Sequence, residues 1–153
     1  MPKKERFKIF IAVYLFLINK SGEILFLKRA NTGYQDGKFG LIQGHLDGDE
    51  SAKQGIIREA KEEAGIILKY EDLEAVNFMH LRFDLEYIDI FFKADKWEGE
   101  IINGEPNKCV ELKWFPLDAL PENIVPEVAI AIENFKKKVF YDEVGWGNLS
   151  NKN

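Results

Sequence analysis

The stretch from Gly44 to Ile66 constrains this chain most, because it predicts a helix with three glutamates on one face. Glu59 and Glu63 lie one turn apart, and Glu62 follows Glu59 at the i, i+3 spacing. Small and apolar residues share this face, so part of it should pack against the protein core. Like charges at these spacings repel one another, and their partial burial requires compensating positive charge.

Two sources of positive charge suit these glutamates. Arg58 stands four residues before Glu62 and is placed to hold that carboxylate. The remaining deficit suits a hard divalent cation such as Mg²⁺ or Mn²⁺, which takes oxygen ligands. Gly55, inside the helix, costs about 1 kcal/mol relative to alanine. That cost indicates close approach of another backbone, and we expect it to be that of the loop from Gly44 to Glu50.

Two helices are predicted. Asp49 or Ser51 can cap the first one, which should run to about Ala64 before Gly65 ends it. The second should begin near Pro126 and end in the lysine run at 136–138, where positive charge complements the helix dipole.

Between and around these helices the pattern predicts short strands, so the fold class is mixed α/β. Turn residues at 19–22 predict a hairpin of the first two strands. No repeat or linker divides the chain, and we expect a single domain over residues 1–153. The predicted strands are about 7–18, 23–29, 39–42, 66–68, 75–83, 87–94 and 110–115, with loops at 30–38 and 97–107.

Composition excludes several classes of protein. The 153 residues carry 21 Lys and Arg against 26 Asp and Glu, a formal net charge of −5, which argues against a nucleic-acid-coating protein. The apolar run from Ile9 to Ile18 is too short to span a bilayer and lacks the flanks of a signal peptide. The single cysteine, Cys109, excludes a disulfide framework. We expect a cytoplasmic protein that binds neither polymeric nucleic acid nor membrane.

The glutamate-bearing stretch resembles the Nudix box, whose pattern is G-x5-E-x7-R-E-U-x-E-E-x-G-U with U an aliphatic residue. A match at all seven fixed positions of this pattern would arise by chance in a chain this long on the order of once in a million. The resemblance implies a MutT-like α/β/α sandwich around a mixed β-sheet. It also implies hydrolysis of a nucleoside diphosphate linked to another moiety. The fixed positions of the box are Gly44, Glu50, Arg58, Glu59, Glu62, Glu63 and Gly65, matched without a gap over residues 44–66.

The resemblance further implies a role for each matched residue. Arg58 would orient the glutamates rather than touch substrate. The general base differs among branches of the family, so Glu62, Glu59 and Glu105, the last from a later loop, are all candidates. Bound Mg²⁺ or Mn²⁺ would neutralise the diphosphate and acidify an attacking water. The implied metal-binding set is Gly44, through its carbonyl, with Glu50, Glu59, Glu62 and Glu63.

Substrate recognition is expected outside the box. Signatures of other branches are missing: Arg82 occupies the place of a proline that ADP-ribose hydrolases tend to have. A nucleoside triphosphate, with an oxidised one such as 8-oxo-dGTP as a candidate, is therefore the preferred substrate, cleaved to monophosphate and pyrophosphate. Glu127 stands where oxidised-purine enzymes carry an acidic base contact, although Val125 replaces a stacking aromatic. His45 is a candidate phosphate contact.

Two other interpretations stay open. A sugar nucleotide or a dinucleotide would use the same catalytic residues. A non-catalytic Nudix module that senses a nucleotide would usually have lost box carboxylates, and this chain keeps all of them. Many relatives are dimers, so the resemblance also leaves a homodimer open.

Overall fold

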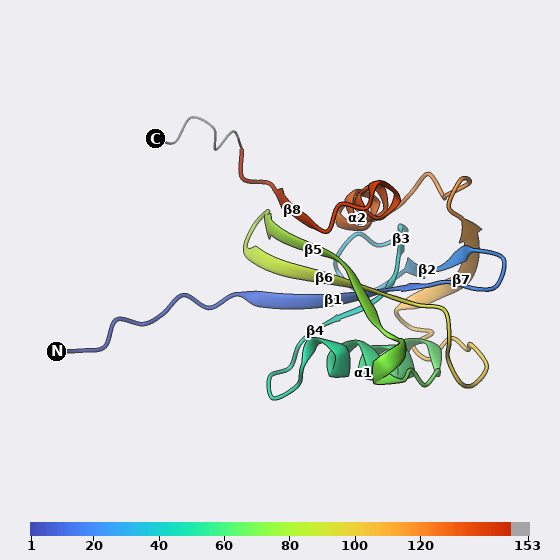
Figure 1. The fold of residues 1–153 in the computed structure, drawn as a ribbon, viewed down its shortest axis with the longest axis horizontal. Helices are drawn as coiled ribbons and strands as arrows, with labels where there is room; N and C mark the ends of the chain where they lie inside the picture. Colours follow the sequence, from blue (N-terminus) through green and yellow to red (C-terminus); the bar gives the residue numbers. More distant parts are fainter. Residues whose placement is uncertain (148–153) are drawn as a thin grey trace.

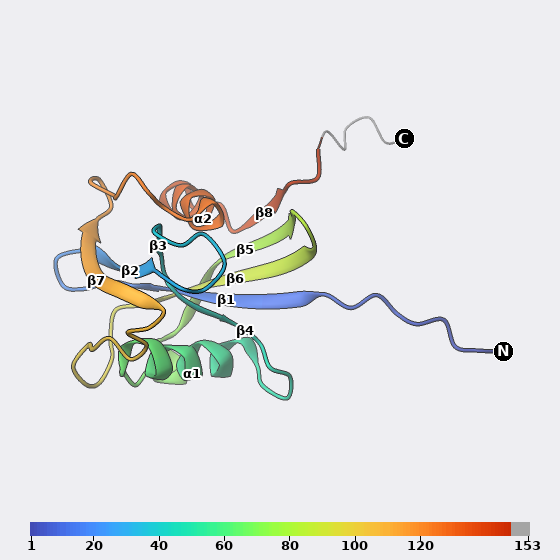
Figure 2. The same cartoon turned by 180° about the vertical axis from the view of Figure 1, so that it is seen from behind.

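The computed structural model describes residues 1–147, which form two β-sheets between two helices (Figure 1). Helix α1 (Ala52–Ala64) covers one side of the strands and α2 (Pro126–Lys137) covers the other, as the reverse view in Figure 2 also shows. The expected α/β/α sandwich is confirmed. The single domain over 1–153 stays a prediction, and residues 148–153 lie outside the described range.

The larger sheet is mixed, with the strand order β4-β1-β6-β5-β8. Its inner strand β1 (Phe10–Leu17) pairs antiparallel with β4 (Ile42–His45) and parallel with β6 (Glu86–Ala94). β5 (Glu74–Arg82) pairs antiparallel with β6, and β8 (Tyr141–Val144) runs parallel to β5 at the edge.

The smaller sheet has the order β3-β2-β7, made of Phe39–Gly40, Glu23–Arg29 and Cys109–Pro116. The turn predicted after β1 is present, but β1 and β2 pair only at the Ile18–Ile24 bridge and then enter different sheets. The predicted hairpin is therefore wrong beyond its turn. β1 is buried on both faces, and such a strand belongs in the middle of a covered sheet.

Three smaller predictions also need correction. Ile66–Leu68 is not a strand, because only Ile67 forms an isolated bridge, with Glu98. The strand expected at 39–42 is divided between β3 and β4, which lie in different sheets. The edge strand β8 and the short 3-10 helix η1 (Tyr70–Asp72) were not predicted, since neither carries an apolar alternation of useful length.

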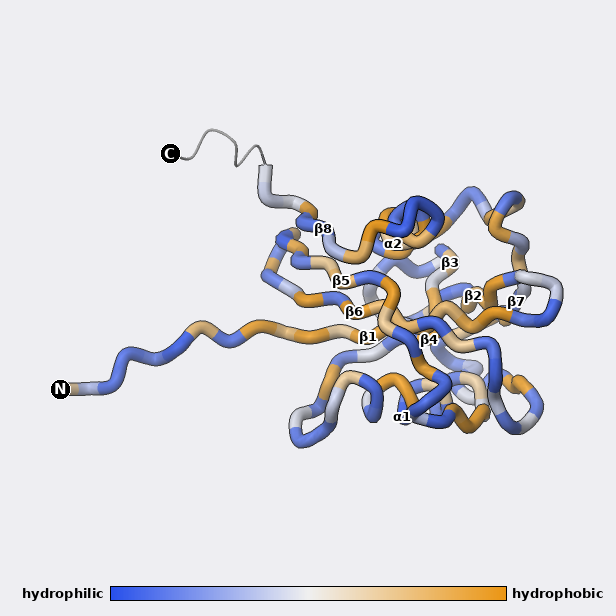
Figure 3. Tube along the Cα trace, viewed as in Figure 1, coloured by the Kyte–Doolittle hydropathy of each residue, from blue (hydrophilic) through white to orange (hydrophobic). Residues whose placement is uncertain are grey.

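The two helices cover separate cores that share β1. Val13, Leu15 and Leu17 point to the α1 side, whereas Ala12, Tyr14 and Phe16 point to the α2 side. Figure 3 shows this strand as a hydrophobic segment that runs between the layers. Burying each large aliphatic side chain contributes about 1.5–3 kcal/mol. Within the described residues, no helix combines the length and the hydropathy needed to cross a membrane.

Helix α1 is fixed at both ends as predicted. Ser51 is the N-cap: its hydroxyl accepts from the Gln54 N–H at 3.2 Å, while Gln54 Oε1 accepts from the Ser51 N–H at 2.8 Å. Gly65 ends the helix at φ 68°, a left-handed conformation that favours glycine. A Cβ on Gly55 would collide with the Leu46 side chain, so the 44–50 loop does approach the helix here. The contact is made by a side chain and not, as predicted, by the loop backbone.

Candidate active site

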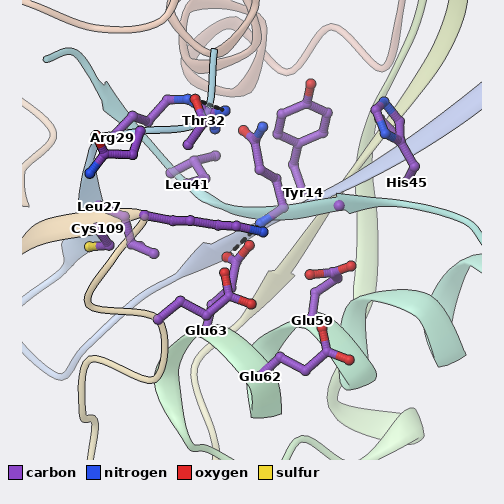
Figure 4. Close-up of a pocket in the computed structure, with 16 residues that line it drawn as sticks. Tyr14, Leu27, Arg29, Thr32, Leu41, His45, Glu59, Glu62, Glu63 and Cys109 are labelled. Atoms are coloured by element: carbon purple, nitrogen blue, oxygen red, sulfur yellow. Dashed lines mark hydrogen bonds between the residues drawn. The ribbon is translucent and has the colours of Figure 1, made fainter. Parts of the chain in front are cut away.

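One face of α1 turns toward β4 and lines a cavity of about 410 Å³, here called the acidic cavity. Glu59, Glu62 and Glu63 enter it from the helix, and Glu105 enters from the loop before β7. Figure 4 shows the three helix glutamates on one side of the space, with Tyr14 across from them. The acidic cavity therefore contains four carboxylates, three from one helix and one from a loop about forty residues later in the chain.

Arg58 links the helix to the loop that precedes it. Its Nη2 and Nε contact the two oxygens of Glu50 at 2.7 and 3.1 Å, and its Nη1 contacts Glu59 Oε1 at 2.7 Å. Nη2 also donates to the His45 carbonyl at 3.1 Å. The predicted pair with Glu62 is present at 3.6 Å, but the two shorter contacts are stronger. Hydrogen bonding to Arg58 lowers the pKa of the Glu50 carboxyl.

Two glycines let backbone segments approach α1 closely. A Cβ on Gly44 would collide with the Glu59 carboxylate, so only glycine fits where β4 passes over the helix. A Cβ on Gly104 would likewise collide with the Glu62 carbonyl oxygen. The Gly104 N–H donates to the Glu63 carbonyl at 3.0 Å, and this contact carries Glu105 to the cavity.

Burial gives the helix glutamates perturbed pKa values. Glu59 is 9% exposed, and burial raises its pKa despite the contact with Arg58. Burial raises the pKa of Glu63 well above its usual range, and the nearby charge of Glu59 raises it further. The backbone N–H of Gln43 donates to Glu63 Oε2 at 3.1 Å and partly offsets this effect. The acidic cavity is therefore short of positive charge.

This donor set suits a hard divalent cation, because it offers several carboxylate oxygens whose burial and mutual repulsion a cation would relieve. Glu59, Glu62, Glu63 and Glu105 are the residues that could hold one. In residues 1–147, no three acidic, histidine or cysteine side chains stand close enough to form a metal site as they are arranged. The suitability of this site for a divalent cation is therefore argued from the type and the burial of its donor groups.

A second cavity of about 620 Å³ adjoins the first on the α2 side of the larger sheet and is here called the sheet cavity. The pairing of three strands determines which residues form the floor of this cavity. Ala12 of β1 lies between His45 of β4 and Asp89 of β6. The small Ala12 side chain leaves the floor open. The residues that line both cavities are Ala12, Tyr14, Arg29, Thr32, Gln43 and His45.

Two buried carboxyls lie in the sheet cavity. Asp89 is 3% exposed and Glu127 is 4% exposed. The Tyr34 hydroxyl donates to Glu127 Oε2 at 2.9 Å. Burial, with a further contribution from the charge of Glu127, raises the pKa of Asp89 to about 7. One wall of the cavity is mostly apolar and is made of Leu81, Phe83 and Tyr87. This cavity therefore combines polar groups with an aromatic surface.

The residues singled out in the sequence fall into these two cavities. The acidic cavity holds Gly44, Glu59, Glu62, Glu63 and Glu105, and Arg58 joins Glu50 to it. His45 lines both cavities, whereas Glu127 lines only the sheet cavity. The catalytic, metal-binding and substrate-binding roles of these residues stay predictions.

Sequence reasoning missed Asp89, Tyr34 and Arg29. Asp89 left a signal, because an acid between Ile88 and Ile90 interrupts a strand on its buried side. Tyr34 left none, since it lies in a polar loop and meets Glu127 only through the fold. Val125 is fully buried, so it offers no surface for stacking.

Comparison with known proteins places these observations in a family. A model of the NUDIX domain matches residues 8–135. The chain is 31% identical over 133 residues to an ADP-ribose pyrophosphatase of Methanocaldococcus jannaschii, covering 86% of this chain and 72% of that protein. It is 27% identical over 125 residues to the 8-oxo-dGTP diphosphatase of Escherichia coli, covering 80% and 95%. A crystal structure of a MutT NUDIX hydrolase from Burkholderia pseudomallei is similar, with a TM-score of 0.74 and 26% identity, covering 82% of this chain and 97% of that one.

Proposed function

Because this chain belongs to the Nudix family of hydrolases, which act on pyrophosphate bonds, we propose that it cleaves a nucleoside triphosphate to the monophosphate and pyrophosphate. The observation that carries this proposal is the junction of the two cavities. A nucleotide can place its phosphates among the glutamates of the acidic cavity while its base enters the sheet cavity beside Asp89 and Glu127.

In this proposal the glutamates of α1 hold the divalent metal. Glu59 and Glu63 would supply the main carboxylate oxygens, with Glu62 beside them and with Glu50 and the Gly44 carbonyl completing the set. When bound, Mg²⁺ would neutralise the diphosphate and lower the pKa of a water molecule, which could then lose a proton and attack phosphorus. Arg58 keeps Glu50 and Glu59 in place through its contacts of 2.7 Å to each.

A carboxylate must accept the proton of the attacking water. Glu59 is engaged by Arg58 at 2.7 Å, and Glu63 accepts from the Gln43 backbone. The Glu62 side chain is 48% exposed and has only the 3.6 Å contact to Arg58. We therefore favour Glu62 as the general base, with Glu105 as the alternative.

Cationic side chains are available for the phosphates. Arg29 lines both cavities, and its guanidinium is held by the Thr32 hydroxyl at 3.1 Å and the Tyr34 carbonyl at 2.9 Å. A guanidinium fixed in this way can pair with phosphate oxygens in a defined geometry. Lys108 lines the acidic cavity, and His45 lies where the cavities join.

The nucleobase of the substrate would contact the carboxyls of the sheet cavity. Asp89, with its pKa near 7, can present a proton, while Glu127 accepts. Phe83 and Tyr87 provide aromatic surface beside them. An oxidised purine such as 8-oxo-dGTP is a finer candidate, supported by the similarity to the enzyme of Escherichia coli that is named for it.

ADP-ribose is a second candidate substrate. The supporting observation is the 31% identity to a protein named ADP-ribose pyrophosphatase. The same glutamates would act on its diphosphate, and the two candidates differ in what must fit beyond the acidic cavity. Dimerisation and a cytoplasmic location stay predictions.

The test is product analysis with Mg²⁺ on a panel of normal and oxidised nucleoside triphosphates, ADP-ribose, sugar nucleotides and dinucleotides. Monophosphate with pyrophosphate from a triphosphate is the expected result. AMP with ribose phosphate as the dominant products would favour the second candidate. Metal-dependent binding without turnover of any compound would contradict both and favour a sensing module.

A further inference from the structure

Gln43 is the residue at which the two cavities and the acidic helix meet. Its backbone N–H donates to Glu63 Oε2 at 3.1 Å, which fixes its position relative to the proposed metal-binding glutamates. It pairs with Tyr14 across the β4–β1 ladder, so the two side chains share the α2 face of the sheet. It lines both cavities.

The side-chain amide of Gln43 is unsatisfied. Its Oε1 is buried and has no hydrogen-bond partner within residues 1–147. This oxygen lies over Gly40, at 3.7 Å from where a Cβ on that glycine would stand. An amide carries an acceptor at one end and donors at the other, and a half-turn exchanges the two ends. No contact within the described residues therefore fixes which end of this amide, the acceptor or the donor, faces the cavities, and a bound ligand can fix it.

Three other polar side chains at the junction, those of Arg29, Thr32 and Tyr14, already have partners. The Arg29 guanidinium donates to Thr32 and Tyr34, and the Thr32 hydroxyl contacts Asp36 at 2.6 Å. The Tyr14 hydroxyl lies beside the Asp89 carboxyl. Gln43 is thus the residue at the junction whose buried polar atom still lacks a partner.

The position of Gln43 identifies the part of the substrate it meets. In a nucleotide the sugar lies between phosphates and base, so a nucleotide that spans the cavities must place its sugar at their junction. A ribose hydroxyl is both donor and acceptor, and it can satisfy the amide in either direction. We propose that Gln43 contacts a sugar hydroxyl, 2′ or 3′, and makes the enzyme select nucleotides that carry this hydroxyl over those that lack it. This inference rests on the proposed function and holds for either candidate substrate.

The experiment compares GTP with its 2′-deoxy and 3′-deoxy forms as substrates of the wild type, Gln43→Met and Gln35→Met. Gln35 lines the sheet cavity but not the acidic one, so it is the matched control. For the wild type, kcat/KM should favour GTP over at least one deoxy form by about fivefold to tenfold, the range of one net hydrogen bond. Gln43→Met should bring that ratio close to one, while Gln35→Met should leave it unchanged.

Binding of GMP and its two deoxy forms without metal, followed by calorimetry, gives a readout that does not depend on turnover. The same loss of discrimination is expected there. Thermal unfolding reports whether Gln43→Met keeps its fold, and Gln43→Ala repeats the comparison with a smaller side chain.

Each unfavourable outcome has a separate meaning. If the wild type hydrolyses GTP but does not discriminate, or if Gln43→Met keeps the discrimination, the inference about Gln43 is wrong and the proposed function stands. An equal loss on all three substrates would also overturn it, because Gln43 would then act on the phosphates they share. If the wild type hydrolyses neither a nucleoside triphosphate nor ADP-ribose, the proposed function fails and the inference fails with it.

Discussion

The acidic cavity and the sheet cavity both contain buried carboxyls, yet they compensate for them differently. In the acidic cavity Glu59 is held by the full charge of Arg58, and its pKa is still raised by burial. In the sheet cavity Glu127 is held by the neutral hydroxyl of Tyr34. A site short of positive charge attracts cations, whereas a site with neutral partners attracts neutral hydrogen-bonding groups. Similar carboxyls thus lie in different electrostatic surroundings, which is the basis of the different roles proposed for the two cavities.

The largest expected effect comes from neutralising the acidic cavity. Glu59→Gln and Glu63→Gln should each lower kcat with Mg²⁺ by about a thousandfold, since each removes a charge that would stabilise the reaction's metal site. Without metal the fold should be unchanged or slightly more stable, because repulsion is relieved. Steady-state kinetics and thermal unfolding measure the two effects. The exposed Glu133→Gln on α2 is the control, and near-normal activity in both cavity variants would remove the metal assignment.

In the sheet cavity the expected effect is on stability as a function of pH. The pKa of Asp89 is about 7 in the fold against an ordinary value of 3.8, so the folded protein keeps a proton that the unfolded chain loses. The stability that Asp89 contributes is therefore full below about pH 4 and falls as the pH rises toward 7. Relative to Asp89→Asn, the wild type should lose roughly 3 to 4 kcal/mol across this range. Denaturant unfolding at several pH values measures it, and parallel curves for the two proteins would contradict it.

Arg58→Lys should sharpen the comparison by keeping the charge and removing the geometry. A lysine cannot contact Glu50 at two atoms and Glu59 at a third, so both carboxylates lose their fixed position. We expect kcat/KM to fall by about ten- to a hundredfold, as for residues that orient metal ligands. Arg82→Lys, outside both cavities, serves as the control. If Arg58→Lys keeps full activity, charge alone explains the role of Arg58.

The smallest effect is expected at Tyr34. Tyr34→Phe removes the hydroxyl that donates to Glu127 at 2.9 Å and leaves the ring in place. KM should rise by about threefold while kcat stays within about twofold, because one neutral hydrogen bond in the sheet cavity is lost. Tyr70→Phe, on η1, provides the control. A fall in kcat with unchanged KM would place Tyr34 in the chemistry instead.

The two cavities also differ in how well the sequence predicted them. Apart from Glu105, the carboxylates of the acidic cavity come from residues 44–66. There the spacing along one helix and its preceding loop fixes the neighbours, so the box glutamates, Arg58 and the approach of the 44–50 loop to Gly55 could be predicted. The sheet cavity brings together Ala12, Asp89 and Glu127, which meet only because β1 pairs with β6 and α2 returns over the sheet. The pattern of neighbouring residues along the sequence does not predict which distant strands pair with one another. For the same reason the hairpin of β1 and β2 was predicted wrongly and β8 was missed.

The parallel pairing of β1 with β6 has a consequence for how the protein acquires its site. Phe10 is paired with Tyr87 and Leu17 with Ala94, so the floor shared by both cavities closes a long loop of chain. Closing such loops is slow, and folding rates fall as contacts become more distant along the chain. During synthesis β1 and α1 are made before β6. The glutamate helix is therefore made early, and the two cavities are complete only when the later half of the chain has folded onto the first.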